Sequence, residues 1–311
     1  MSYTRKLVGY VELLRLHNVM LTMLATAIGV LSSAFYFPVA LDGEVWRTYL
    51  LAAGVTSLIA AGGYVINDYY DLDIDSVNKP WRPLPSGAVS VKSALSLSMI
   101  LFVLGIALSA VIGPISSVLA ALTALLLFIY SKTFKRRGLS GNIIVSFCGA
   151  LSIAYGVISV VDAFNLYSKI FSTNFVLSLI PALHAFVLIL LREIVKGVED
   201  FEGDKVRGVG TLIVVHGIKK TYGVLLALST ILVCISIVPL FAGLGIAYLL
   251  LAMTVDVLVV YALYILKPRD IGDVKSMVIK GARARRILKY AFAIGIMAFL
   301  VGFAEVILRG C

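Results

Sequence analysis

Nine long apolar runs alternate with shorter polar segments along the 311-residue chain. A helix needs roughly 20 apolar residues to cross the hydrocarbon layer of a membrane, which is about 30 Å thick. Runs of this kind lie near residues 18–37, 48–66, 93–113, 115–130, 140–161, 174–194, 221–239, 243–266 and 287–308. The pattern predicts an all-α integral membrane protein with nine transmembrane helices.

The composition excludes a water-soluble globular domain. Hydrophobic residues make up 60% of the chain and charged residues only 14%, and the mean hydropathy is +1.02. Such a chain has too little polar surface to cover its apolar side chains in water. The first apolar run is too long for the hydrophobic region of a signal peptide, so we expect it to remain as a membrane span.

The basic residues predict how the chain is oriented. Of the 27 lysines and arginines, only Arg47, Lys169 and Arg309 fall on the side opposite the N-terminus in the nine-span arrangement. The positive-inside rule therefore places the N-terminus in the cytoplasm and the C-terminus outside, in a multi-pass protein of the cell membrane. The net charge of +10 does not indicate a nucleic-acid partner, because the basic residues sit in loops beside the membrane and alternate with acidic clusters. Membrane lipids or a phosphate-bearing substrate fit better, and no obligate protein partner is evident.

The polar loops predict where the chemistry lies. The connections at 112–114 and 240–242 are short and uncharged, whereas the loops after the second, fourth, sixth and eighth runs are long and polar. Residues 1–311 are interpreted as one transmembrane domain, with helices 1–4 and 5–8 as two four-helix units around a central cavity and a ninth helix at 287–308. We expect the functional site on the cytoplasmic face.

The first acidic motif, NDYYDLDID at 67–75, follows the second run. If the helix continues through it, Asn67, Asp71 and Asp75 stack on one face, with Asp68 beside them. Like charges at this spacing repel one another, so a cation is expected there. Oxygen ligands of this kind suit Mg²⁺ together with substrate phosphate oxygens.

The second acidic motif follows the sixth run. Arg192, Lys196, Asp200 and Asp204 are four residues apart in turn, so one helical stripe carries two cations followed by two carboxylates. In this arrangement Arg192 and Lys196 offer phosphate contacts beside a metal site formed by Asp200 and Asp204. Either motif alone could be an ordinary solvated loop. Two motifs at matching places, with basic runs at 79–87 and 130–137 between them, favour a metal-bound diphosphate.

These segments resemble the signatures of the UbiA-type superfamily of intramembrane prenyltransferases. The stretch NDYYDLDID with the following NKPWRPLPSG is similar to the first signature, REIVKGVEDFEGDKVRGVGTL to the second, and YSKTFK to the segment between them. The likeness covers nearly the whole chain. The family is expected to ionise an isoprenyl diphosphate with Mg²⁺ and to pass the prenyl group to an acceptor.

The resemblance also implies roles for individual residues. One Mg²⁺ is expected on Asn67, Asp68, Asp71 and Asp75, and the other on Asp200 and Asp204. Diphosphate contacts are expected from Lys79, Arg82, Lys135, Arg192 and Lys196. The reacting end is expected to be lined by Tyr130 and Ser131, and the residues expected to be catalytic are Asn67, Asp71, Asp200 and Tyr130. The segment Arg15–Asn18 departs from the common Arg-Pro-x-Asn pattern, and Asp256 inside the eighth run suits either a functional or a structural acid, so neither is given a role.

The acceptor is predicted from the same likeness. The motifs are most similar to the archaeal branch that alkylates geranylgeranylglyceryl phosphate with geranylgeranyl diphosphate in membrane ether-lipid biosynthesis. Transfer to an aromatic ring, as in quinone or haem O biosynthesis, is the alternative within the class. A divalent-cation or phosphate transporter is the alternative from another class, although a transporter more naturally places its carboxylates near mid-bilayer.

A phosphate-bearing acceptor needs a second anion site. Its candidate residues come from two cytoplasmic clusters, namely Lys132, Arg136 and Arg137 in one, and Arg283, Arg285 and Arg286 in the other. The alternative is that these clusters only enforce topology and contact anionic lipids.

Overall fold

The structure is a computed structural model that describes residues 3–206, 208–268 and 274–310. Within these ranges every regular element is a helix, and nine helical stretches are long and apolar enough to span a membrane. The stretches are Lys6–Tyr36, Gly43–Tyr70, Val91–Ser109, Pro114–Phe134, Leu139–Ala163, Thr173–Glu199, Leu212–Phe241, Ile246–Leu266 and Val274–Leu308. Each overlaps one run predicted from the sequence, so the all-α architecture with nine apolar helices is confirmed.

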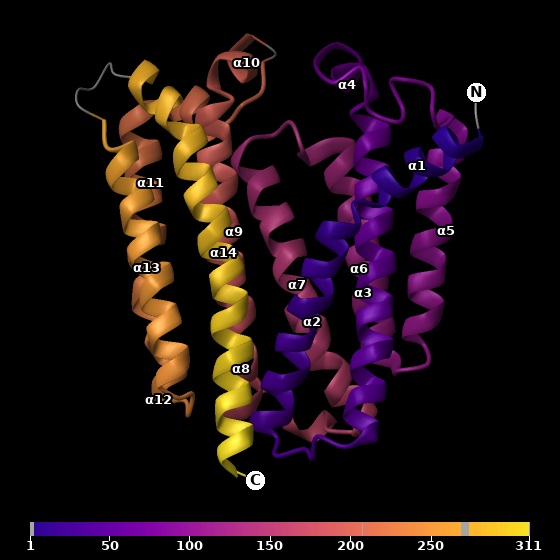
Figure 1. Cartoon of the computed structure of the whole chain (residues 1–311), viewed down its shortest axis with the longest axis vertical. Coiled ribbons are helices and arrows are strands. Elements are labelled where there is room, and N and C mark those ends of the chain that lie inside the picture. The colour runs from indigo at the N-terminus through magenta and orange to yellow at the C-terminus, as the bar shows by residue number, and fades with distance from the viewer. Residues whose placement is uncertain (1–2, 207, 269–273, 311) are drawn as a thin grey trace. The chain divides into compact units, whose positions relative to one another are not determined.

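Several spans contain more than one helix (Figure 1). The order is α1 (Tyr3–Leu14), α2 (Leu16–Tyr36), α3 (Gly43–Tyr70), α4 (Leu72–Asn78), α5 (Val91–Ser109), α6 (Pro114–Ile129), the π-helical turn η1 (Tyr130–Phe134), α7 (Leu139–Ala163), the 3-10 turn η2 (Tyr167–Lys169), α8 (Thr173–Ser178), α9 (Ile180–Glu199), α10 (Phe201–Val206), α11 (Leu212–Ser236), α12 (Val238–Phe241), α13 (Ile246–Leu266) and α14 (Val274–Gly310). The short helices α4 and α10 follow α3 and α9 directly, and they carry parts of the two acidic motifs.

The last helix begins earlier than its apolar run. The run starts near residue 287, whereas α14 starts at Val274. Residues 274–286 include Lys275, Lys280 and three arginines, which lower the hydropathy but are good helix formers. The helix therefore begins on the N-terminal side of the apolar segment.

The chain forms two compact units, Met1–Thr133 with Leu151–Ile170, and Phe134–Ala150 with Phe171–Cys311. In the first unit, α3 packs against α1, α2, α5 and α6. Small residues bring helices close together, because a Cβ on Gly29 of α2 or on Gly156 of α7 would overlap the backbone of the other helix. The buried hydroxyls of Thr26 and Thr56 are 2.8 Å apart and hydrogen-bonded across α2 and α3.

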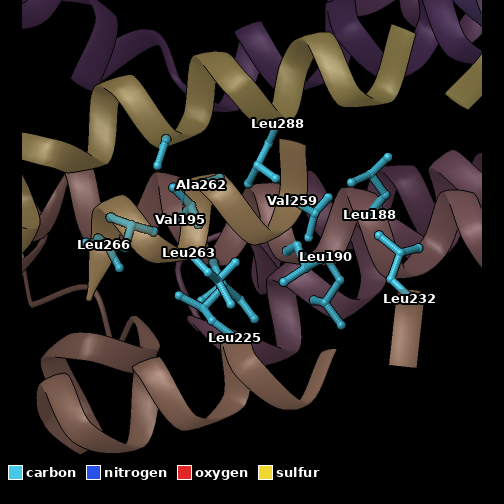
Figure 2. Close-up of a cluster of buried hydrophobic side chains, with 14 of the residues drawn as sticks. Leu188, Leu190, Val195, Leu225, Leu232, Val259, Ala262, Leu263, Leu266 and Leu288 are labelled. Carbon is cyan, nitrogen blue, oxygen red and sulfur yellow. The ribbon is translucent and has the colours of Figure 1, made fainter. Parts of the chain in front are cut away.

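In the second unit, α14 packs against α9 and α13, and α11 packs against the same two helices. Figure 2 shows the buried side chains between them, including Leu190 and Val195 of α9, Leu225 of α11, and Leu288 of α14. In a membrane such a cluster stabilises mainly through close packing, since lipid tails are as apolar as leucine. The cluster fixes α9, which carries Arg192 and Lys196 of the second acidic motif and ends directly before Asp200.

One carboxylate in each unit caps a helix that belongs to another span. Asp162 of α7 is buried, and its Oδ2 accepts a hydrogen bond of 2.6 Å from the backbone N–H of Ser116 at the start of α6. Glu305 of α14 accepts one of 3.0 Å from the N–H of Ala247 at the start of α13. A Cβ on the glycine before either capped helix would overlap the carboxylate, and these glycines are Gly113 and Gly245. The acids satisfy N–H groups that lack partners within their own helix.

Candidate active site

The first acidic motif lies where α3 passes into α4. Asp71 separates the two helices with φ −90° and ψ 0°, yet the helical hydrogen bonding continues across it. The Asp71 N–H donates to the Asn67 carbonyl over 3.0 Å, and the Asp75 N–H donates to the Asp71 carbonyl over 2.8 Å. The four-residue stacking of Asn67, Asp71 and Asp75 therefore survives the break between the helices.

Three carboxylates of this motif form a cluster that fits a divalent cation. One oxygen from each of Asp68, Asp71 and Asp75 lies within 4.8 Å of the others, and in the described part of the chain this is the one group of three or more possible ligands from Asp, Glu, His or Cys so close together. Asp68 is 6% exposed and Asp75 4%, whereas Asp71 is half-buried. The Asn67 side-chain amide donates to Asp71 over 3.3 Å. An oxygen-only set with one accessible carboxylate suits Mg²⁺, which keeps several waters and takes few protein ligands.

Two arginines compensate the buried carboxylates. Arg82 donates to Asp75 over 2.6 Å and to Asp68 over 3.3 Å, and Arg15 contacts the same Asp68 oxygen over 2.5 Å. Buried carboxylates are strongly destabilising unless they are paired. Arg82, predicted as a diphosphate contact, thus binds two carboxylates here, and its contact with substrate stays a prediction.

Arg15 is the site residue that the sequence analysis left without a role. It separates α1 from α2 in the left-handed region, at φ 50°, and its guanidinium lies 5.4 Å from the centre of the Tyr64 ring. A positive φ is costly for a residue with a side chain, and the ion pair with Asp68 holds this turn in place. No local pattern indicates this contact, because a cation near the end of a membrane span ordinarily extends to the interface without a protein partner.

The second acidic motif has a similar backbone but a different environment. Asp200 follows the last residue of α9, and Asp204 lies in α10. The Asp200 N–H donates to the Lys196 carbonyl and the Asp204 N–H to the Asp200 carbonyl, over 2.9 Å each, so the helical register continues. Asp200 is exposed, and Arg192 is half-buried. Neither side chain has an ion-pair or hydrogen-bond partner within residues 3–206, 208–268 and 274–310, whereas Lys196 lies 3.5 Å from Glu193. Arg207, also in this motif, lies outside the described residues.

A basic segment adjoins the loop that follows this motif. Gly138 has φ 59°, and a Cβ on it would overlap the Gly210 carbonyl oxygen. Glycine is required at this contact both for its backbone conformation and for its lack of a side chain. The contact brings the half-buried Lys135, three residues earlier, to the side of the second unit that carries the motif.

The other predicted residues are placed as follows. Lys79 directly follows α4 and is exposed. Tyr130 begins η1 and is half-buried, and Ser131 follows it and is buried. The structure thus gathers Asn67, Asp68, Asp71, Asp75 and Arg82 in the first unit. The predicted meeting of the two motifs at one central cavity stays a prediction.

The two motifs differ in charge compensation. The carboxylates of the first are gathered and partly neutralised by guanidinium groups, whereas the second carries a carboxylate and a guanidinium that lack described partners. The first motif can hold a cation, and the second can receive an anion and a cation together.

Known proteins resemble the chain over almost its whole length. The model of the UbiA prenyltransferase family matches residues 19–282. The digeranylgeranylglyceryl phosphate synthase of Hyperthermus butylicus is 40% identical over 298 residues, which cover 94% of this chain and 96% of that protein. The synthase of the same name from Saccharolobus solfataricus is 42% identical with the same coverage.

Solved structures show the same fold. One that concerns digeranylgeranylglyceryl phosphate synthase in membranes matches with a TM-score of 0.76 and 32% identity, over 96% of this chain and 99% of that one. A UbiA homolog from Archaeoglobus fulgidus bound to DMAPP and Mg²⁺ matches with a TM-score of 0.63 over 92% and 99% of the two chains, and its 19% identity supports the fold alone. Because the family model and the relatives span most of its residues, the chain belongs to the UbiA prenyltransferase family.

Proposed function

We propose that this protein transfers the geranylgeranyl group of geranylgeranyl diphosphate to geranylgeranylglyceryl phosphate, as a step of membrane ether-lipid synthesis. The allylic carbon–oxygen bond of the donor breaks, and diphosphate leaves with the bonding electrons. A hydroxyl oxygen of the acceptor then forms a bond to the allylic carbon and loses its proton. The observation that carries the proposal is identity of 40% and 42%, over 94% of the chain, to two digeranylgeranylglyceryl phosphate synthases.

The first motif is proposed to hold Mg²⁺ together with the diphosphate. The proposed ligands are Asn67, Asp68, Asp71 and Asp75. The carboxylates of the three aspartates are close enough together to share one cation. Bound Mg²⁺ would neutralise the negative charge that develops on the departing diphosphate. Asp200 and Asp204 are the proposed ligands of a second ion.

Protein cations are proposed to complete the diphosphate site. Arg192 is half-buried and has no partner among the described residues, so an anionic ligand would supply the pairing that it lacks. Lys196, Lys135 and Lys79 are the further candidates. Fixed cations directed at the leaving group favour the state in which the bond is breaking, which is where electrostatic stabilisation accelerates a reaction.

The reacting carbon needs protection from water until the acceptor attacks. Tyr130 and Ser131 are proposed to line this end, where the Tyr130 ring could face the allylic cation. The apolar spans around them would exclude water and let the prenyl tails extend into lipid. The site is proposed to open to the cytoplasm, as the distribution of basic residues predicts.

Activity of the purified protein tests the proposal. Labelled geranylgeranyl diphosphate is incubated with geranylgeranylglyceryl phosphate or with 4-hydroxybenzoate, with Mg²⁺ or with excess chelator. We expect a labelled di-ether product from the first acceptor, only with Mg²⁺. Prenylation of 4-hydroxybenzoate alone would overturn the acceptor, and no transfer to either would overturn the proposed reaction.

A further inference from the structure

The N-terminal part of α14 contacts the end of α9 at Glu199, the residue before Asp200. The Arg285 Nε lies 2.7 Å from the Glu199 Oε2, although the N–H is not aligned for a hydrogen bond, so the contact is an ion pair. The Glu199 side chain is 22% exposed and that of Arg285 41%. Arg285 was a candidate for the acceptor phosphate, and here it is occupied by a carboxylate of the second motif.

The backbones also meet at this point. A Cβ on Gly281, one turn before Arg285, would lie 3.0 to 3.1 Å from the Cα and N of Glu199. That spacing is closer than ordinary van der Waals contact, so glycine lets α14 approach the last turn of α9. Gly281 and Arg285 therefore hold the same residue of α9 by packing and by charge.

We propose that Arg285 is a positioning residue, which fixes the last turn of α9 and thereby the direction of the Asp200 carboxylate. Directly beyond Asp200 the chain continues as the six-residue helix α10, and so short a helix is marginally stable by itself. Asp200 is exposed between α9 and α10, so its position depends on the backbones of these two helices. Restraining Glu199 reduces the number of directions in which Asp200 can point, which matters for a metal ligand. The inference rests on the proposed role of Asp200 in Mg²⁺ binding.

Two measurements on the whole 311-residue chain test this proposal. Hydrogen exchange of the amides at 199–206 reports on the restraint itself, without substrate or metal. The Mg²⁺ concentration for half-maximal turnover reports on Asp200. The variants are Arg285→Met, Gly281→Ala, the exchanged pair Arg285→Glu with Glu199→Arg, and Lys289→Met as the matched control, an exposed cation one turn further along α14.

In Arg285→Met and Gly281→Ala we expect about 2- to 5-fold faster exchange at 199–206, since the pair is partly exposed and contributes modestly. The Mg²⁺ requirement of Arg285→Met should rise about 3- to 10-fold, while the KM for the acceptor stays unchanged. The exchanged pair should restore most of the wild-type exchange rate and Mg²⁺ requirement. Lys289→Met should change neither quantity.

Three outcomes would overturn the proposal. Unchanged exchange in Arg285→Met would show that the residue does not restrain α9. Faster exchange with an unchanged Mg²⁺ requirement would show that the Arg285–Glu199 pair is a structural contact without a role in metal binding. A raised acceptor KM that the exchanged pair does not repair would assign Arg285 to the acceptor phosphate instead. If the wild-type protein lacks prenyl transfer, the proposed function fails and so does the positioning role, while the exchange data still decide whether the restraint exists.

Discussion

Asp68, Asp71 and Asp75 have different surroundings although their oxygens are close together. Asp68 and Asp75 are buried and bound by guanidinium groups, whereas Asp71 is half-buried beside the Asn67 amide. A buried carboxylate that loses its partner is costly, while an accessible one that repels its neighbours adds little to the stability of the metal-free protein. We therefore expect the three acids to respond differently to mutation.

Asp71→Ala should lower turnover by at least about 100-fold, as when a group that stabilises leaving-group charge is removed. The melting temperature of the metal-free protein should change little, because the mutation relieves repulsion from Asp68 and Asp75. Asp200→Ala should behave in the same way. Turnover assays and thermal unfolding in detergent check both variants, and near-wild-type activity at ordinary Mg²⁺ in either would refute that ligand assignment.

Arg15→Met should destabilise the fold by about 1–3 kcal/mol, because the buried Asp68 then keeps only Arg82 as a cationic partner and shares it with Asp75. Adding Asp68→Asn should return part of this loss, since the neutral amide no longer needs a cation. Thermal unfolding of the single and double variants measures the difference. Equal destabilisation of wild type and of Asp68→Asn by Arg15→Met would show that the ion pair does not hold the turn between α1 and α2.

At the scale of helices, the two tertiary caps occupy equivalent places in the chain. Asp162 lies on the fifth span and caps the fourth, and Glu305 lies on the ninth span and caps the eighth. The placement repeats with a period of four spans, although the halves show no evident sequence identity. The caps give the fifth and ninth spans equivalent places in the chain, while the division into spans 1–4 and 5–8 stays a prediction.

Asp162→Ala and Glu305→Ala should each cost about 1–2 kcal/mol, the typical loss when a helix cap is removed. Turnover per folded molecule should not change, because neither acid belongs to the acidic motifs. Thermal unfolding and specific activity separate the two effects, with the exposed Glu44→Ala as a control. A large loss of specific activity in a variant of unchanged stability would give that acid a catalytic role and refute the capping interpretation.

The elements also show where sequence reasoning succeeds and where it fails. Hydropathy located the nine spans, because membrane crossing imposes a length of apolar residues that is visible without any contact. Four-residue spacing located the stacking of Asn67, Asp71 and Asp75, since it depends on helix geometry alone. Arg15 reaches Asp68 across 53 residues, and Arg285 reaches Glu199 from another helix, so both pairs depend on packing that no local pattern encodes. The start of α14 was missed because hydropathy detects apolar length rather than helix propensity.

At the scale of the whole molecule, the proposed function requires both acidic motifs on one side of the membrane. The first follows the second span and the second follows the sixth, and an even number of crossings separates them. Each motif therefore returns to the side of the N-terminus, which the basic loops assign to the cytoplasm. If the proposed Mg²⁺ ions at the two motifs share one diphosphate, we predict that the motifs face each other.

Single cysteines test this arrangement, and the structure supplies three well-exposed positions. Val77 in α4 is 82% exposed, Val206 in α10 is 87% exposed, and Phe171 between the fifth and sixth spans is 90% exposed. Each is changed to cysteine in a variant whose native cysteines are replaced by alanine, and intact cells are treated with a membrane-impermeant maleimide. Cysteine at 171 should react in intact cells, and cysteines at 77 and 206 only after permeabilisation. High exposure at all three positions means that lack of reaction does not report burial within the protein, and reaction after permeabilisation shows that the cysteine is accessible to the reagent. Reaction at 77 and 206 from opposite sides would exclude a shared site, whereas reaction of both from outside would keep the site and reverse the orientation.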